Sequence, residues 1–159
     1  MVKVLDPCCG SRMFYFDKDN PNVLYQDCRI VDTVLCDGRK LKIKPDVLGD
    51  FTSMAYPQNT FSVVVFDPPH LIHAGGNSWL AKKYGTLPKD WKECISKGFK
   101  ECFRVLKPCG VLIFKWNSEQ IPFADVIKLA PQKPLLGDQR GKTRWIVFVK
   151  ESDVANGDK

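Results

Sequence analysis

Apolar residues in this chain form short continuous runs, interrupted once by a longer segment with helical spacing. Residues 61–66 read F-S-V-V-V-F, and such a nearly unbroken apolar run is typical of a strand covered on both faces of a parallel sheet. Residues 91–106 instead place an apolar side chain at every third or fourth position, which predicts an amphipathic helix. Pro108, Cys109 and Gly110 follow, and we expect them to end that helix.

Shorter patterns predict the remaining elements. Further strands are predicted over residues 2–6, 23–25, 46–51, 111–114, 134–136 and 143–150. A helical turn is predicted over residues 13–16 and a short helix over residues 122–129, whereas residues 31–45 are ambiguous and residues 71–88 are Gly-rich and irregular. The last two strands are joined by a short polar loop, which predicts an antiparallel hairpin.

The order of these elements predicts an α/β fold. Strands that alternate with helices or irregular crossovers are typical of a doubly wound, mostly parallel sheet, here of about seven strands with a C-terminal antiparallel hairpin. About 15 residues join the first two strands, close to the minimum for a parallel crossover, so any helix there must be short or distorted. We expect one domain over residues 1–150 and a disordered tail over residues 151–159.

Composition and charge change this interpretation little. The chain has 159 residues, of which 44% are hydrophobic and 26% charged, ordinary values for a globular domain. The net charge of +6 suits an anionic partner such as nucleic acid. It stays below the strongly basic balance of a dedicated DNA-binding module, and a mildly basic solvated surface is the alternative explanation.

The cysteines and the apolar segments bear on metal binding and location. Seven cysteines are scattered without a C-x-x-C pair, so we expect no metal site and reduced thiols in a cytoplasmic protein. No apolar stretch approaches the ~20 residues that cross a membrane, so no membrane partner is expected. The chain enters a strand-like run directly at its first residues, so we expect no signal peptide.

The strand exits are the candidate binding sites, because ligands of doubly wound sheets bind beyond the carboxyl ends of the strands. The first strand leaves through a small-residue turn that lets backbone N–H groups approach a ligand, although it lacks the G-x-G-x-x-G pattern. The second leaves at an acid that can accept both hydroxyls of a ribose, and the third at an Asp-Phe pair that can hold an adenine ring. Each acid alone could be a turn former or a helix cap, but their recurrence favours a cofactor site. The candidate cofactor-binding residues are Asp6, Pro7, Cys8, Cys9, Gly10, Asp27, Asp50 and Phe51.

The fourth strand leaves through Asp67, Pro68, Pro69 and His70. With this motif the chain resembles the S-adenosylmethionine-dependent methyltransferases of Rossmann-like fold, specifically the amino-methyltransferases with a D-P-P-Y motif, which include small phage-like DNA N6-adenine methyltransferases. The stretch L-D-P-C-C-G-S resembles their cofactor loop, and F-R-V-L-K-P-C-G-V-L resembles a run common across these folds. The resemblance covers roughly residues 2–150. It implies S-adenosylmethionine as cofactor and the four residues of the motif as the catalytic site.

The motif also has a physical logic of its own. An exocyclic amine of adenine or cytosine is a poor nucleophile, because its lone pair is delocalised into the ring. Acceptors around the NH₂ group, the Asp67 carboxylate and the Pro68 carbonyl, would stabilise its developing positive charge. His70 stands where the family has Tyr or Phe; an imidazole can still stack on an extruded base, or can be a turn residue without a role. No metal is required.

Residues 71–87 follow the motif and suit a lid or substrate clamp, or alternatively a plain surface loop. The lysines of this segment could contact phosphates, and its aromatic side chains could stack on a base. A second basic patch lies in the terminal hairpin. The candidate substrate-binding residues are His73, Trp79, Lys82, Lys83, Arg140 and Arg144.

The resemblance implies methylation of N6 of adenine in DNA. The family's usual target-recognition domain is missing from the pattern, so we expect low sequence specificity, or specificity supplied by the 71–87 loop, a homodimer or a specificity partner. RNA is the nearest alternative substrate. The sequence is also compatible with a protein-glutamine or small-molecule methyltransferase, and with a non-catalytic binding subunit that has the cofactor fold.

Overall fold

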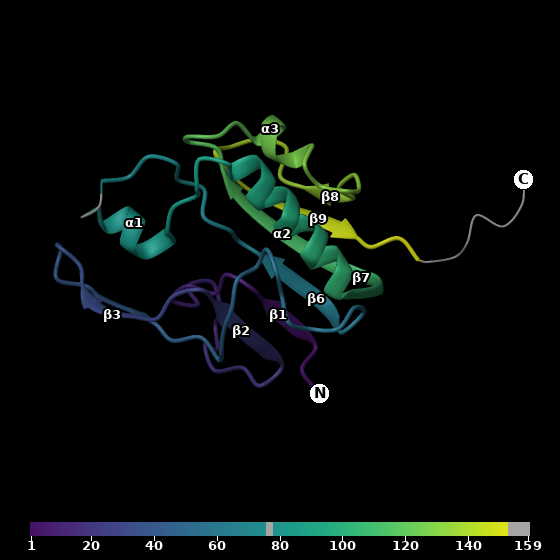
Figure 1. The fold of residues 1–159 in the computed structure, drawn as a ribbon, viewed down its shortest axis with the longest axis horizontal. Helices are drawn as coiled ribbons and strands as arrows, with labels where there is room; N and C mark the ends of the chain where they lie inside the picture. The colour runs from purple at the N-terminus through teal and green to yellow at the C-terminus, as the bar shows by residue number, and fades with distance from the viewer. Residues whose placement is uncertain (76–77, 153–159) are drawn as a thin grey trace, which may run out of the picture.

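The computed structural model describes residues 1–75 and 78–152 (Figure 1). Residues 76 and 77 of the Gly-rich segment, and most of the predicted disordered tail, lie outside the described residues. The strands are β1 (Val4–Asp6), β2 (Val23–Asp27), β3 (Val31–Val34), β4 (Lys40–Ile43), β5 (Val47–Leu48), β6 (Phe61–Phe66), β7 (Leu106–Asn117), β8 (Leu136–Gly137) and β9 (Thr143–Val149). The helices are α1 (Trp79–Tyr84), α2 (Trp91–Val105) and α3 (Phe123–Ile127).

One seven-stranded sheet organises the molecule, in the order β5-β2-β1-β6-β7-β9-β8. Strands β5, β2, β1, β6 and β7 pair in parallel, whereas β9 runs antiparallel to both β7 and β8. This arrangement confirms the predicted α/β class, with its mostly parallel sheet and C-terminal antiparallel pair. The parallel strands present their carboxyl ends at one edge, so their exits meet there.

Strand β6 and helix α2 build the core. Figure 1 shows α2 lying along β6 and β7, and the apolar stripe predicted from the spacing faces this sheet, with Ile95, Phe99 and Cys102 fully buried. The helix approaches closely because it carries Gly98: a Cβ atom there would lie 2.7 Å from the rings of Phe51 and Phe66. A larger residue at this position would force the helix away from the sheet, at a cost of about 1–3 kcal/mol.

The crossover from β1 to β2 contains turns, and the helical turn predicted over residues 13–16 is wrong. The segment is held by side chains. The Arg12 guanidinium lies 3.8 Å from the centre of the Tyr25 ring, and the Tyr15 ring packs edge-on against the same ring at 5.0 Å. Aromatic and cation–π contacts thus cover β2 here, where a crossover helix would usually pack its apolar face.

Two insertions occupy the stretches whose pattern was ambiguous or irregular. Residues 31–45 contain the antiparallel pair β3–β4, which has a small core of its own made by Leu35, Leu41 and Ile43. The 71–88 segment contains α1, which buries none of its residues. None of the helices in the described parts of the chain combines the length and the apolar character needed to span a membrane.

Candidate functional site

The exit of β1 forms the floor of the site. Asp6 is fully buried, and its carboxylate accepts hydrogen bonds from the backbone N–H of Cys8 (3.2 Å) and from the hydroxyl of Tyr15 (3.0 Å). Burial raises the pKa of Asp6 to about 7, and these two hydrogen bonds oppose the rise. Asp6 therefore shapes the loop from beneath; within that loop Pro7 and Cys9 are buried, and Cys8 and Gly10 are partly exposed.

The two adjacent thiols in this loop are poor nucleophiles. Burial raises the pKa of Cys9 to about 12 and that of Cys8 well above its usual range. Because the thiolate is the reactive form of cysteine, both side chains act as small packing groups at neutral pH.

Asp27, at the exit of β2, ties the loop to the neighbouring strand. One carboxylate oxygen accepts the Gly10 N–H at 2.9 Å, and the other accepts the backbone N–H (3.0 Å) and Nε (3.3 Å) of Arg29. Gly10 has a φ of +50°, a conformation that a residue without a Cβ adopts most easily. The acid expected to receive ribose hydroxyls thus also fixes the loop.

At the exit of β5, the two predicted cofactor-binding residues, Asp50 and Phe51, have different surroundings. The exposed Asp50 bonds its own turn, accepting from the backbone N–H (2.7 Å) and the hydroxyl (2.8 Å) of Thr52. The Phe51 ring is 9% exposed, packs edge-on against Phe66 and lines a cavity beside Asp27. Phe51 is therefore the better placed of the two to contact a ligand.

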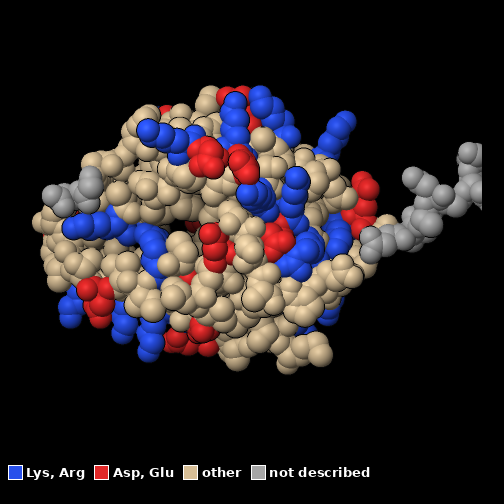
Figure 2. All heavy atoms as spheres, in the orientation of Figure 1, with Lys and Arg blue, Asp and Glu red and all other residues tan. Residues whose placement is uncertain are grey.

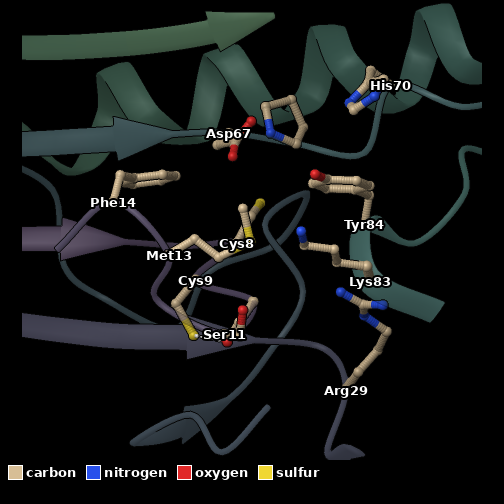
Figure 3. Close-up of a pocket in the computed structure, with 12 residues that line it drawn as sticks. Cys8, Cys9, Ser11, Met13, Phe14, Arg29, Asp67, His70, Lys83 and Tyr84 are labelled. Atoms are coloured by element: carbon tan, nitrogen blue, oxygen red, sulfur yellow. Dashed lines mark hydrogen bonds between the residues drawn. The ribbon is translucent and has the colours of Figure 1, made fainter. Parts of the chain in front are cut away.

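At the exit of β6, the Asp67 carboxylate points into the site, and its side chain is 17% exposed (Figure 3). It accepts one hydrogen bond, at 3.1 Å from Nζ of Lys115 to Oδ2. Burial raises the pKa of Asp67, while the ammonium of Lys115 partly counteracts the rise. One oxygen is thus held by Lys115, and the other keeps its capacity to accept.

His70 is half-buried and lies among aromatic rings. Its ring centre is 5.4 Å from that of Tyr84 and 6.2 Å from that of Trp116. Burial, followed by the charge of Lys115, lowers the pKa of His70. The imidazole is consequently neutral at pH 7 and presents an uncharged planar surface, as a tyrosine or phenylalanine would.

Lys115 is the residue that the sequence interpretation missed. It lies near the carboxyl end of β7, the strand next to β6, and its ammonium is 5.4 Å from the ring centre of Phe14 and 5.7 Å from that of Trp145. The available signal was its position: a lysine at the exit of an otherwise apolar predicted strand.

Two small cavities meet at Asp67. One, of about 30 Å³, includes Asp67, Pro68 and His70; the other, of about 40 Å³, includes Asp27, Phe51 and Pro69. Figure 3 shows Tyr84 and Lys83 of α1 and the side chain of Arg29 directed at the first of them. The two cavities share the lining residues Cys8, Arg29, Asp67 and Tyr84.

The residues present fit an adenosyl cofactor, but the space does not in this closed arrangement. Asp27 supplies two acceptor oxygens, Phe51 an aromatic face, and Gly10 a close backbone approach. A ligand of that size needs roughly 300 Å³ or more. Helix α1 closes the site through Tyr84 and through the bond from Nη1 of Arg29 to the Lys82 carbonyl (3.0 Å), and it buries none of its own residues.

The candidate substrate-binding residues are spread along one edge of the molecule. Lys83 lines the Asp67 cavity, whereas Trp79 is 37% exposed and lies between Lys83 and Arg39. His73 is exposed, and its backbone is held by the Gln120 side chain. The remaining residues lie outside the two cavities: Lys82 beside Arg29, and Arg140 and Arg144 near the end of β7.

Within the described residues, no group of three or more His, Cys, Asp and Glu side chains could hold a metal ion. All seven cysteines are free.

No protein-family model matches the chain, and no curated protein matches it by sequence. Solved structures do resemble it. The PH0226 protein of Pyrococcus horikoshii matches with a TM-score of 0.62 and 16% identity over 94% of this chain and 82% of that one. A TehB-like S-adenosylmethionine-dependent methyltransferase from Corynebacterium glutamicum matches with a TM-score of 0.55 and 13% identity over 94% of this chain and 80% of that one.

A further S-adenosylmethionine-dependent methyltransferase, from Leishmania major, matches with a TM-score of 0.52 and 13% identity over 92% of this chain and 64% of that one. At such identities the similarity establishes the fold. The chain thus has the fold that these methyltransferases share, and the site described above lies at the carboxyl edge of its parallel strands.

Proposed function

We propose that this protein is an S-adenosylmethionine-dependent methyltransferase that acts on an exocyclic amine of a nucleic-acid base, with N6 of adenine in DNA as the expected target. The observation that carries the proposal is the Asp67 carboxylate. It lies at the exit of β6 between the Cys8–Gly10 loop and the rings of His70 and Tyr84, with one oxygen held by Lys115. The fold shared with known methyltransferases supports it.

The cofactor would be held by the residues of the first three strand exits. When bound, S-adenosylmethionine supplies a methyl group that its sulfonium already activates. Asp27 would accept the ribose hydroxyls in place of its bonds from Arg29, and Phe51 would contact the adenine ring. The N–H groups of the loop up to Gly10 would approach the rest of the molecule.

The amine would be activated by acceptors that the fold holds in place. Asp67 accepts one N–H of the NH₂ group, and the Pro68 carbonyl, whose aim is restricted by proline, accepts the other. As the nitrogen gained the methyl carbon, the C–S bond of the sulfonium would break with its electron pair left on sulfur, the cofactor would leave as the neutral thioether S-adenosylhomocysteine, and the nitrogen would lose one proton. The carboxylate of Asp67, with its raised pKa, is placed to take that proton and pass it to solvent.

The base itself would be held by stacking. His70 is neutral and lies 5.4 Å from Tyr84, so the two rings border the position next to Asp67 from different segments. A base–aromatic stack is worth roughly 1–3 kcal/mol and carries little sequence information. This fits an enzyme that reads little sequence.

A substrate screen tests the proposal. The protein is incubated with methyl-labelled S-adenosylmethionine and, separately, with duplex DNA, single-stranded DNA, RNA and a peptide pool. We expect label on DNA, at N6 of adenine after nuclease digestion. Label confined to RNA would change the substrate, and label confined to peptide would overturn the nucleic-acid assignment. Tight cofactor binding without label on any acceptor would favour a non-catalytic binding subunit.

A further inference from the structure

We propose that the β3–β4 hairpin carries a basic groove that binds the phosphate backbone of the nucleic-acid substrate and leads the strand to Asp67. This inference rests on the proposed function, since it assigns a binding surface to that substrate. The groove is formed by the lysines of the strand β4 region and by the segment that follows the β1 exit.

The lysines form a regular row. Lys40, Lys42 and Lys44 alternate with Leu41 and Ile43, which are buried in the core of the hairpin, so all three lysines point away from that core. Residues two apart in a strand lie about 6.6–6.8 Å apart on the same face. The row is therefore an extended line of exposed positive charge and not a compact cluster.

The groove is continuous with the catalytic cavity. It has a volume of about 610 Å³, and Gly10 and Ser11 line both the groove and the cavity at Asp67. A strand lying in the groove thus passes directly beside the loop that borders Asp67. The full lining of the groove is Gly10, Ser11, Arg12, Lys18, Asp19, Lys40, Lys42, Lys44, Pro45 and Asp46.

Its two acidic residues share one arginine, and its lysines outnumber them. Asp19 and Asp46 both pair with Arg12, at 3.1 and 3.2 Å, and Arg12 in turn lies on the Tyr25 ring. Among the described residues, the ammonium groups of Lys18, Lys40, Lys42 and Lys44 form no ion pair. Asp32 lies opposite Lys42 across the β3–β4 ladder, so it partly offsets the charge of that lysine.

The other basic patch, in the C-terminal hairpin, is more strongly engaged. Lys142 pairs with Glu119, and the Arg144 guanidinium lies 4.8 Å from the Phe123 ring centre while bonding the Gly141 carbonyl. Figure 2 shows Lys and Arg side chains along the lower left margin of the molecule, where Figure 1 places the β3 hairpin. The groove is consequently the better site for a polyanion.

A nucleic-acid strand fits the row better than a small anion does. Each strand of a duplex presents a phosphate charge about every 3.4 Å along its axis, so a row of three lysines can meet several phosphates at once. Such contacts set the position of the backbone without reading bases. At the tip of the hairpin Arg39 lies 5.7 Å from the ring centre of Trp79, which joins the groove to α1 and places an aromatic ring at its end.

The test compares two triple variants with the same change of charge. One is Lys40→Glu, Lys42→Glu and Lys44→Glu; the matched control is Lys89→Glu, Lys92→Glu and Lys100→Glu, three exposed lysines in and just before α2. Binding of a fluorescent DNA oligonucleotide, single-stranded and duplex, is measured by anisotropy at several salt concentrations. We expect the affinity of the groove variant for DNA to fall at least about tenfold. The slope of its log affinity against log salt concentration should become shallower by the amount that corresponds to two to three lost phosphate contacts. The control should stay within about threefold.

Further arms separate this proposal from the proposed function. Calorimetric binding of S-adenosylmethionine should be equal in wild type and both variants, and the neutral set Lys40→Gln, Lys42→Gln and Lys44→Gln should give an intermediate loss. Oligonucleotide binding that needs the groove, without methyl transfer, would refute the proposed function and keep the groove. Equal losses in both triple variants, or binding of the wild type to anionic phospholipid vesicles or inorganic phosphate but not to oligonucleotide, would overturn the groove.

Discussion

Two aspartates lie at the same edge of the sheet, at the ends of the strands on either side of β1, and their surroundings differ. Asp27 at the end of β2 is 4% exposed and accepts from three N–H donors of Gly10 and Arg29. Asp67 at the end of β6 accepts from Lys115 alone and lines both cavities. A carboxylate offers about four acceptor sites, so Asp27 is largely committed to holding its loop, whereas Asp67 keeps most of its sites available to a ligand.

The largest effect should come from Asp67→Asn. The amide keeps the shape of the side chain and removes the charge, so we expect kcat to fall by about 10² to 10⁴. Cofactor affinity should stay within a few-fold of wild type, because Asp27 and the loop remain intact. Turnover is measured with the acceptor found in the substrate screen. Asp50→Asn, at the exposed exit of β5, is the matched control, and near-normal turnover of Asp67→Asn would show that the catalytic loop is wrongly assigned.

The second-largest effect should be on cofactor affinity and not on kcat. Asp27→Asn loses the charge that binds Gly10 and Arg29, and hydrogen bonds to charged groups are worth roughly 1.5–3 kcal/mol. We expect the dissociation constant of S-adenosylmethionine to rise by about ten- to a hundredfold, with kcat at saturating cofactor falling much less. Calorimetry and saturation kinetics measure the two quantities. A variant with unchanged cofactor affinity and lost turnover would contradict the division of roles between the two acids.

The third effect concerns pH. Asp67 acts as an acceptor in its ionised form, and burial raises its pKa, so activity should be lost on acidification above the range of an ordinary aspartate. Lys115 lowers that pKa; Lys115→Met should therefore move the acidic limb of the pH–rate profile to higher pH and reduce kcat at pH 7 by roughly tenfold. Lys115→Arg keeps the positive charge and should retain most of the wild-type kcat at pH 7.

Lys115 also lowers the pKa of His70, so the origin of the shift needs a control. The limb should move equally when Lys115→Met is combined with His70→Phe. If the shift disappeared in the double variant, His70 and not Asp67 would be the titrating group.

The smallest effect should come from His70→Phe. A neutral imidazole and a phenyl ring offer similar stacking surfaces, so we expect kcat and KM within about threefold of wild type. For His70→Ala we expect kcat/KM to fall roughly tenfold, mostly through a higher KM, because a stacking contact is removed. Both are measured at pH 7, where the wild-type imidazole is uncharged. Total loss of turnover in a correctly folded His70→Phe protein would require a chemical role for the imidazole.

Most of the sheet could be predicted from local patterns, whereas some elements between its strands could not. β6 is marked by a nearly unbroken apolar run and α2 by helical spacing over 15 residues, and both elements are confirmed within a few residues. The 13–16 segment has aromatic residues but no helical stripe, and it is ordered by Arg12 and Tyr25, 13 positions apart in the chain. The β3–β4 hairpin and α1 are short, and short segments carry too few repeats to reveal a period.

The candidate site divides in the same way. That acids and prolines stand at strand exits follows from the order of residues, because parallel strands end at one edge of their sheet and bring those exits together. The chemistry of each acid depends on neighbours distant in the chain: Lys115 for Asp67, 48 positions away, and Gly10 for Asp27, 17 positions away. Hydrogen bonding and desolvation act over a few ångströms in space, so only the folded arrangement could distinguish the acid that holds the loop from the one that faces the substrate cavity.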